Sequence, residues 1–126
     1  MIVDSSALLA SLFGEEKGTW VEEQLNQHRT TLKMSVVNLA EVLILLRERQ
    51  PKLSSNLSKT VKQLPIEFVP VTQAQAELAS VARHEFRSLN FGDCFVYALA
   101  KVENETILTL DSDFKKTDLK IVIPKE

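Results

Sequence analysis

Short apolar runs alternate with longer segments of helical periodicity along this chain. Four of the runs have the character of buried strands and lie at 1–3, 66–71, 106–110 and 120–123. A fifth segment, 30–34, is compatible with a short strand or with an extended entry into the next helix. Because strands alternate with helices, the pattern predicts one α/β domain with a mostly parallel central sheet.

The segments between these runs have helical patterns with recognisable ends. Ser5 and Ser6 are expected to cap a first helix, which Gly14 ends. Thr72 and Gln75, three residues apart, match a capping box. Further helices are expected at 19–27, 35–49, 51–64, 72–86 and 92–102. The last of these is apolar on nearly all sides, which predicts that it is buried.

Composition narrows the function classes without choosing among them. The 126 residues fit a single domain, 1–126, and 44% hydrophobic residues suffice for a real core. A net charge of −2 argues against a protein that coats nucleic acid by bulk charge, but not against a nuclease with an acidic site. The single cysteine, Cys94, allows no internal disulfide and is expected in the core, whereas His28 and His84 are expected at the surface.

No targeting or membrane segment is evident. The start of the chain lacks the basic region and long apolar core of a signal peptide. The longest strictly apolar run, 42–46, is far too short to span a bilayer. We therefore expect a cytoplasmic protein without a membrane partner.

Glu41 interrupts the otherwise apolar stretch 34–46. An ionised carboxylate in an apolar medium is costly, so it should shift its pKa, pair with a cation or bind a metal. No cation lies nearby within the same helix. The alternative is a narrow solvent-exposed stripe that runs through Asn38, Glu41 and Leu45.

Three other acids occupy comparable settings. Asp4 and Asp111 each follow a short apolar strand, and Asp93 lies at the start of the most apolar helix. Each alone is more often a cap or turn residue. In a parallel sheet, however, ligands bind beyond the carboxyl ends of the strands. Four carboxylates without matched Lys or Arg favour a shared hard cation, Mg²⁺ or Mn²⁺, because the donor set lacks His and Cys.

Four motifs, in this order, resemble those of PIN-domain ribonucleases, and specifically VapC-type toxins of type II toxin–antitoxin pairs. The matching segments are MIVDSSAL at 1–8, NLAEV at 38–42, LNFGDCFVYALA at 89–100 and ILTLDSDF at 107–114. The resemblance implies an α/β/α sandwich with a short central sheet and an RNA endonuclease that depends on Mg²⁺, with Mn²⁺ as a substitute. Its catalytic and metal-binding quartet would be Asp4, Glu41, Asp93 and Asp111.

The resemblance also implies supporting residues and partners. Supporting or alternate ligands would be Asp113, Ser5, Ser6, Asn38 and Thr109, with Asp113 the competitor of Asp111 for the fourth acid. A homodimer and a cognate antitoxin are implied, the antitoxin lying in a partly exposed apolar groove around 36–64. Several basic residues, expected mostly in solvent with a few on RNA phosphates, are Arg47, Arg49, Lys52, Lys59, Lys62, Arg83 and Arg87.

Two other functions stay open from the residues alone. One is a different Mg²⁺-dependent phosphohydrolase, although Asp4-Ser5-Ser6 lacks the Asp-x-Asp that a haloacid-dehalogenase-type phosphatase needs after its first strand. The other is a non-catalytic module whose acids bind a cation or a basic peptide. No aromatic platform for base stacking is evident in the sequence.

Overall fold

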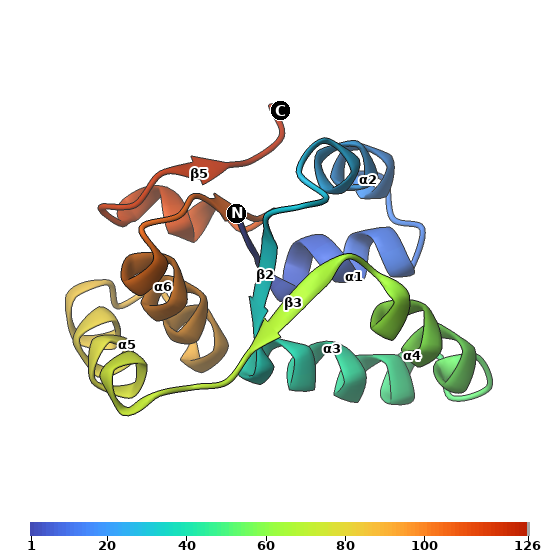
Figure 1. Ribbon diagram of the computed structural model, residues 1–126, viewed down its shortest axis with the longest axis horizontal. Coiled ribbons are helices and arrows are strands. Elements are labelled where there is room, and N and C mark those ends of the chain that lie inside the picture. The colour runs from blue at the N-terminus through green and yellow to red at the C-terminus, as the bar shows by residue number, and fades with distance from the viewer. Residues whose placement is uncertain (126) are drawn as a thin grey trace.

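A wholly parallel sheet lies at the centre of the protein (Figure 1). The structure is a computed structural model that describes residues 1–125. Within these residues the sheet has five strands in the order β3-β2-β1-β4-β5. The strands are β1 Ile2–Val3, β2 Leu32–Ser35, β3 Ile66–Val69, β4 Ile107–Leu108 and β5 Ile121–Val122.

Helices cover both faces of this sheet. They are α1 Ser5–Leu12, α2 Gly18–Gln27, α3 Val36–Arg49, α4 Ser54–Gln63, α5 Gln73–Glu85 and α6 Phe91–Glu103, with a short 3-10 helix, η1, at Ser112–Lys116. In Figure 1, α5 and α6 lie together on one side of the strands, and α1 to α4 lie on the other. None of the described helices is long and apolar enough to cross a bilayer.

Two apolar cores follow from the alternation of side chains along the strands. Val3 and Leu108 pack with the helices α1 to α4, whereas Ile2 and Ile107 pack with α5 and α6. Successive side chains of a strand point to opposite faces, so two-residue strands suffice to serve both cores. The predicted α/β/α sandwich is confirmed.

Element boundaries differ from the predicted ones where turns intervene. Segment 30–34 overlaps a true strand, β2, which extends to Ser35 and pairs in parallel with β1 and β3. The helix expected from Pro51 begins only at Ser54, because residues 51–53 form a turn in which the Leu53 amide donates to the Gln50 carbonyl. At α5, Thr72 accepts from the Gln75 amide at 3.2 Å, but the Gln75 side-chain oxygen is buried without a partner. The capping box predicted there is therefore only half formed.

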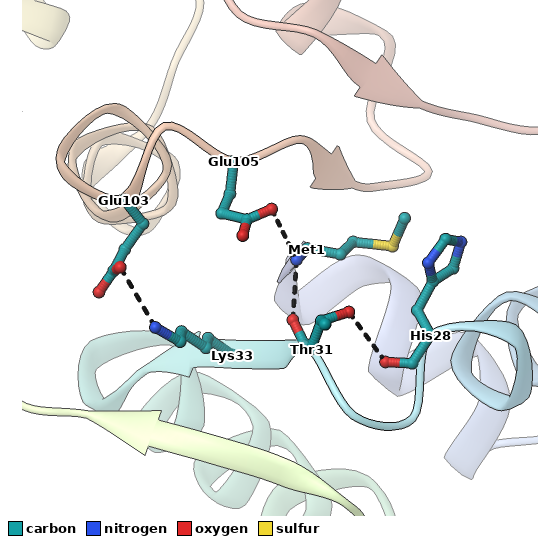
Figure 2. A network of polar contacts seen from close by, with 6 residues as sticks. All are labelled: Met1, His28, Thr31, Lys33, Glu103 and Glu105. Atoms are coloured by element: carbon teal, nitrogen blue, oxygen red, sulfur yellow. Dashed lines mark hydrogen bonds and ion pairs between the residues drawn. The ribbon is translucent and has the colours of Figure 1, made fainter.

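Polar contacts tie the amino ends of the strands together (Figure 2). The amino group of Met1 donates to the Thr31 carbonyl at 2.8 Å and pairs with Glu105 at 3.1 Å. Lys33 on β2 pairs with Glu103 at 3.2 Å. The opposite, carboxyl end of the sheet is the end where Asp4 emerges from β1.

Candidate functional site

A cavity of about 390 Å³ brings the four predicted acids together at the carboxyl end of the sheet. Because β1 pairs with β4, with Val3 opposite Leu108, the chain segments that follow these two strands leave side by side. Asp4, Glu41, Asp93 and Asp111 all line this cavity. Its other lining residues are Ser5, Ser6, Leu9, Glu15, Leu45, Arg49, Asn90 and Leu110.

Asp4 is the most deeply buried of the four, with 1% of its surface exposed. Its Oδ2 atom accepts hydrogen bonds from the hydroxyls of Ser6 and Thr109, each at 2.7 Å. Ser5 lies farther, 3.5 Å from Oδ1. Asp4 occupies the cap position of α1 without a side-chain capping bond, so the expectation that Ser5 and Ser6 cap this helix is wrong. The hydroxyls of Ser6 and Thr109 instead fix the Asp4 carboxylate.

The same two hydroxyls shape the loop after β4. Thr109 Oγ1 accepts from the Asp111 amide at 2.9 Å, and Ser6 Oγ accepts from the Leu110 amide at 3.2 Å. Asp111 therefore lies three residues beyond the end of β4 rather than directly at it. Its position depends on the groups that also hold Asp4.

Asp93 comes from the first turn of α6 and is 7% exposed. Its Oδ2 accepts from the Asn90 amide at 3.0 Å, and the Asn90 side chain accepts from the Asp93 amide at 2.9 Å. This reciprocal pair is a complete capping box. Asp93 is therefore a first-turn acid of α6, and it also lines the cavity.

Glu41 is partly exposed, so it lies neither fully within the apolar interior nor fully in solvent. The cavity opens its carboxylate to solvent, and the fully buried polar residue of α3 is Asn38. Asn38 Nδ2 donates to Glu41 Oε1 at 2.8 Å and to the Gly92 carbonyl at 3.0 Å. Because both partners are acceptors, they also define which end of the Asn38 amide carries the nitrogen.

Gly92 completes the support of Glu41. A Cβ atom at this position would collide with both carboxylate oxygens of Glu41. Asn38 therefore holds the Glu41 carboxylate against α6, in space that only a glycine leaves free. Asn38 itself does not line the cavity.

The structure separates the two candidates for the fourth acid. Asp111 lines the cavity, and its Oδ1 accepts from the Asp113 amide at 2.9 Å as the cap of η1. Asp113 pairs instead with Lys116 at 3.4 Å and does not line the cavity. This placement favours Asp111.

The donor set fits a hard divalent cation, because every acidic group in the cavity wall offers oxygen and no His or Cys is present there. Within residues 1–125, no three His, Cys, Asp or Glu side chains are already gathered closely enough to hold an ion. All four acids accept hydrogen bonds, but Asp4 and Asp93 are also buried, so the adjustment on ion binding falls mainly to the partly exposed Glu41 and Asp111.

The carboxylates influence one another electrostatically. Burial raises the pKa of Asp4, and the charges of Asp111 and Glu41 add to this, against the hydrogen bonds from Ser6 and Thr109. Burial, followed by the charges of the other three acids, raises the pKa of Asp93 to about 7. Proximity of like charges is the condition under which a counter-ion binds favourably.

We expect the ion-free protein to lose stability as the pH rises from about 4 to about 7. The raised pKa means that folded Asp93 binds its proton more tightly than the unfolded chain does, so this stabilisation is present at low pH and lost as the pH passes about 7. Thermal unfolding in EDTA across this range measures it, and Asp93→Asn should flatten the profile. Parallel profiles for the two proteins would contradict the assignment.

Several lining residues were not predicted as site residues. Asn90 is identifiable from its capping-box spacing to Asp93. Arg49, which the sequence offered only as one of several basic residues, also lines the cavity. It lies eight residues after Glu41 on the same helix, so the folded cavity contains a cation as well as the acids. The stripe of α3 that faces the cavity is Glu41, Leu45 and Arg49, whereas Asn38 is buried behind it.

A second cavity, of about 370 Å³, lies between α5 and α6 and is mainly apolar. Phe91, at its edge, is 73% exposed, and its ring lies 5.0 Å from that of Phe95. The fold thus exposes one aromatic ring that the sequence pattern did not single out. Cys94 is buried as predicted, and His84 is exposed, whereas His28 is partly buried.

Comparisons with known proteins identify the family. The PIN domain profile matches residues 1–120. Ribonuclease VapC28 of Mycobacterium tuberculosis is 34% identical, over 93% of this chain and 93% of its own length. Ribonuclease VapC42 of the same organism is 30% identical, over 95% and 97%.

Solved structures agree at the level of the fold. The M. tuberculosis toxin VapC20, described as cleaving the sarcin–ricin loop, superposes with a TM-score of 0.82 at 20% identity, covering 98% of both chains. A toxin–antitoxin complex from Klebsiella pneumoniae gives a TM-score of 0.76 at 18% identity, over 99% of this chain and 98% of that one. By profile and by its relatives, the chain belongs to the PIN-domain family and, within it, to the VapC ribonucleases.

Proposed function

We propose that this protein is an endoribonuclease that hydrolyses RNA phosphodiesters with Mg²⁺ or Mn²⁺ and acts as the toxin of a type II toxin–antitoxin pair in the cytoplasm. The observation that carries this proposal is the gathering of four carboxylates around one cavity, in a chain of the VapC ribonuclease family. Asp4, Glu41, Asp93 and Asp111 would hold the ion. When bound, the ion would supply Lewis acidity toward the phosphoryl oxygens of the substrate.

The chain's own residues divide the remaining work. Asp4 and Asp93 are buried and fixed by hydrogen bonds, which suits them to position an ion. Glu41 is partly exposed and held from behind by Asn38, which suits it to orient the attacking water. In the reaction, the oxygen of a water molecule bonds to phosphorus and gives up one proton, one P–O bond of the RNA backbone breaks, and the leaving oxygen gains a proton.

The proposed protein partners are a second copy of this chain and a cognate antitoxin. The groove between α3 and α4, of about 350 Å³, differs from the apolar groove expected around 36–64. Its lining is polar and basic: Arg47, Ser54, Ser55, Ser58, Lys59 and Lys62. Ile44 and Leu53 are exposed elsewhere on this part of the chain. An antitoxin segment that combines acidic with apolar residues would fit this surface.

We expect the purified protein to cleave members of a panel of structured RNAs with Mg²⁺ or Mn²⁺ and to lose this activity in EDTA. The reason is that the carboxylate oxygens of the cavity wall are ligands that suit a hard cation such as Mg²⁺ or Mn²⁺. Cleavage that persists in EDTA would refute metal dependence. Turnover of a phosphomonoester without RNA cleavage would indicate another phosphohydrolase, and ion binding without any turnover would indicate a non-catalytic module.

A further inference from the structure

Arg49 brings a positive charge to the wall of the acidic cavity. Glu41, Leu45 and Arg49 are four residues apart on α3, so they lie on one face of the helix, and all three line the cavity. Eight residues of helix separate Glu41 from Arg49 by about 12 Å along the axis. The cavity therefore has a catalytic, acidic region and a cationic region on the same helix face.

The guanidinium of Arg49 is held in place by an aromatic ring rather than by an acid. Its central carbon lies 5.5 Å from the centroid of the Phe13 ring, at the end of α1, and Phe13 packs against the core. Within residues 1–125, Arg49 forms neither an ion pair nor a side-chain hydrogen bond, although Glu15 lines the same cavity. Arg49 is otherwise exposed, so this cation–π contact restrains the guanidinium beside the ring and leaves its N–H donors free.

An unpaired guanidinium in the wall of the same cavity as the carboxylates meets a specific need of the proposed reaction. The carboxylates and the net charge of −2 repel the phosphates of an RNA strand. Arg binds phosphate through two parallel N–H···O bonds, which gives direction as well as attraction. A little over two turns of α3 separate Arg49 from Glu41, so a strand whose reacting phosphate lies at Glu41 would present a neighbouring phosphate to Arg49.

We propose that Arg49 binds a phosphate of the RNA strand that flanks the scissile one, and that Phe13 holds the guanidinium ready for this contact. The inference rests on the proposed ribonuclease function. It makes Arg49 a substrate-positioning residue: it sets where the strand lies, and the carboxylates act on the phosphate that this placement presents.

Two measurements test this role. In cleavage assays with Mg²⁺ or Mn²⁺, Arg49→Ala should raise KM about tenfold or more with little change in kcat, because a charge-assisted contact to the substrate is lost. In the catalytically disabled Asp4→Asn background, fluorescence anisotropy should show weaker binding of a single-stranded RNA. The slope of log K against log salt should become shallower by about 0.7, the value for one phosphate contact on a single strand.

Matched variants separate a specific contact from bulk charge. Arg29→Ala removes the same charge from an exposed site in the connection between α2 and β2, so it should leave KM and the salt slope unchanged. Arg49→Lys keeps the charge but loses the paired N–H donors of the guanidinium, so it should recover only part of the affinity. Phe13→Leu keeps an apolar side chain without the aromatic ring, and should weaken RNA binding in the same direction but less.

The outcomes are distinguishable. Failure of the wild-type protein to cleave any RNA overturns the proposed function and this inference together. If the wild type cleaves RNA but Arg49→Ala matches it in KM and salt slope, only the role of Arg49 is overturned. Equal losses for Arg49→Ala and Arg29→Ala would show bulk charge and would also overturn it.

Discussion

Asp4→Asn should reduce RNA cleavage by more than about a hundredfold while leaving the fold intact. About a hundredfold is the upper range for residues that merely orient a metal ligand, and Asp4 is proposed as a ligand itself. Asparagine keeps the size of the side chain and one oxygen that can accept from Ser6 and Thr109. It also removes a buried carboxylate whose pKa burial raises, so the ion-free protein should not lose stability.

Asp113→Asn is the matched control for this loss. Asp113 lies close by in the chain to Asp111, pairs with Lys116 in an exposed setting and does not line the cavity. Its variant should retain nearly full activity under the same conditions, measured as initial cleavage rates, with circular dichroism to verify folding. An active Asp4→Asn protein would remove Asp4 from the site, and an equally impaired Asp113→Asn protein would reassign the fourth acid.

Gly92→Ala should also lower cleavage sharply, by up to about a hundredfold, without unfolding the protein. The added Cβ would occupy the space of the Glu41 carboxylate, which is the far end of a flexible side chain, so the carboxylate turns away and its bond from Asn38 breaks. A displacement of about 1 Å in a catalytic group can cost this much. Alanine is the better helix former by roughly 0.5–1 kcal/mol, so the thermal unfolding midpoint should stay level or rise.

A double-mutant cycle tests whether this effect passes through Glu41. In a protein that already carries Glu41→Gln, adding Gly92→Ala should cause little further loss of activity, because the affected carboxylate is gone. Independent effects would instead multiply. Full additivity, or a lowered unfolding midpoint for Gly92→Ala alone, would mean that Gly92 acts through the fold rather than through Glu41.

The sequence predicts the parts of this site that depend on strand and helix geometry. Parallel strands end at one edge of a sheet, so Asp4 and Asp111 meet if their strands are neighbours, and β1 does pair with β4. Asp93 was placed at the start of its helix because the apolar pattern of that helix begins there. Such features depend on local patterns and on few topological choices.

The supports of the site depend on long-range contacts that no local pattern encodes. Asn38 and Gly92 are 54 residues apart, and their contact exists only once α3 packs against α6. The local pattern assigned Ser6 to capping, and only the family resemblance named it as a supporting residue. In the structure its hydroxyl donates to Asp4 and accepts from the Leu110 amide. The place of Arg49 likewise requires α1 to bring Phe13 beside α3.

The central claim is that the four carboxylates share one divalent ion, and crystals grown with Mn²⁺ test it most directly. The anomalous difference map should show a peak inside the cavity, in direct contact with oxygens of Asp4 and Asp93 and with Glu41 or Asp111 turned toward it. A peak outside the cavity, or no peak at saturating Mn²⁺, would contradict the account.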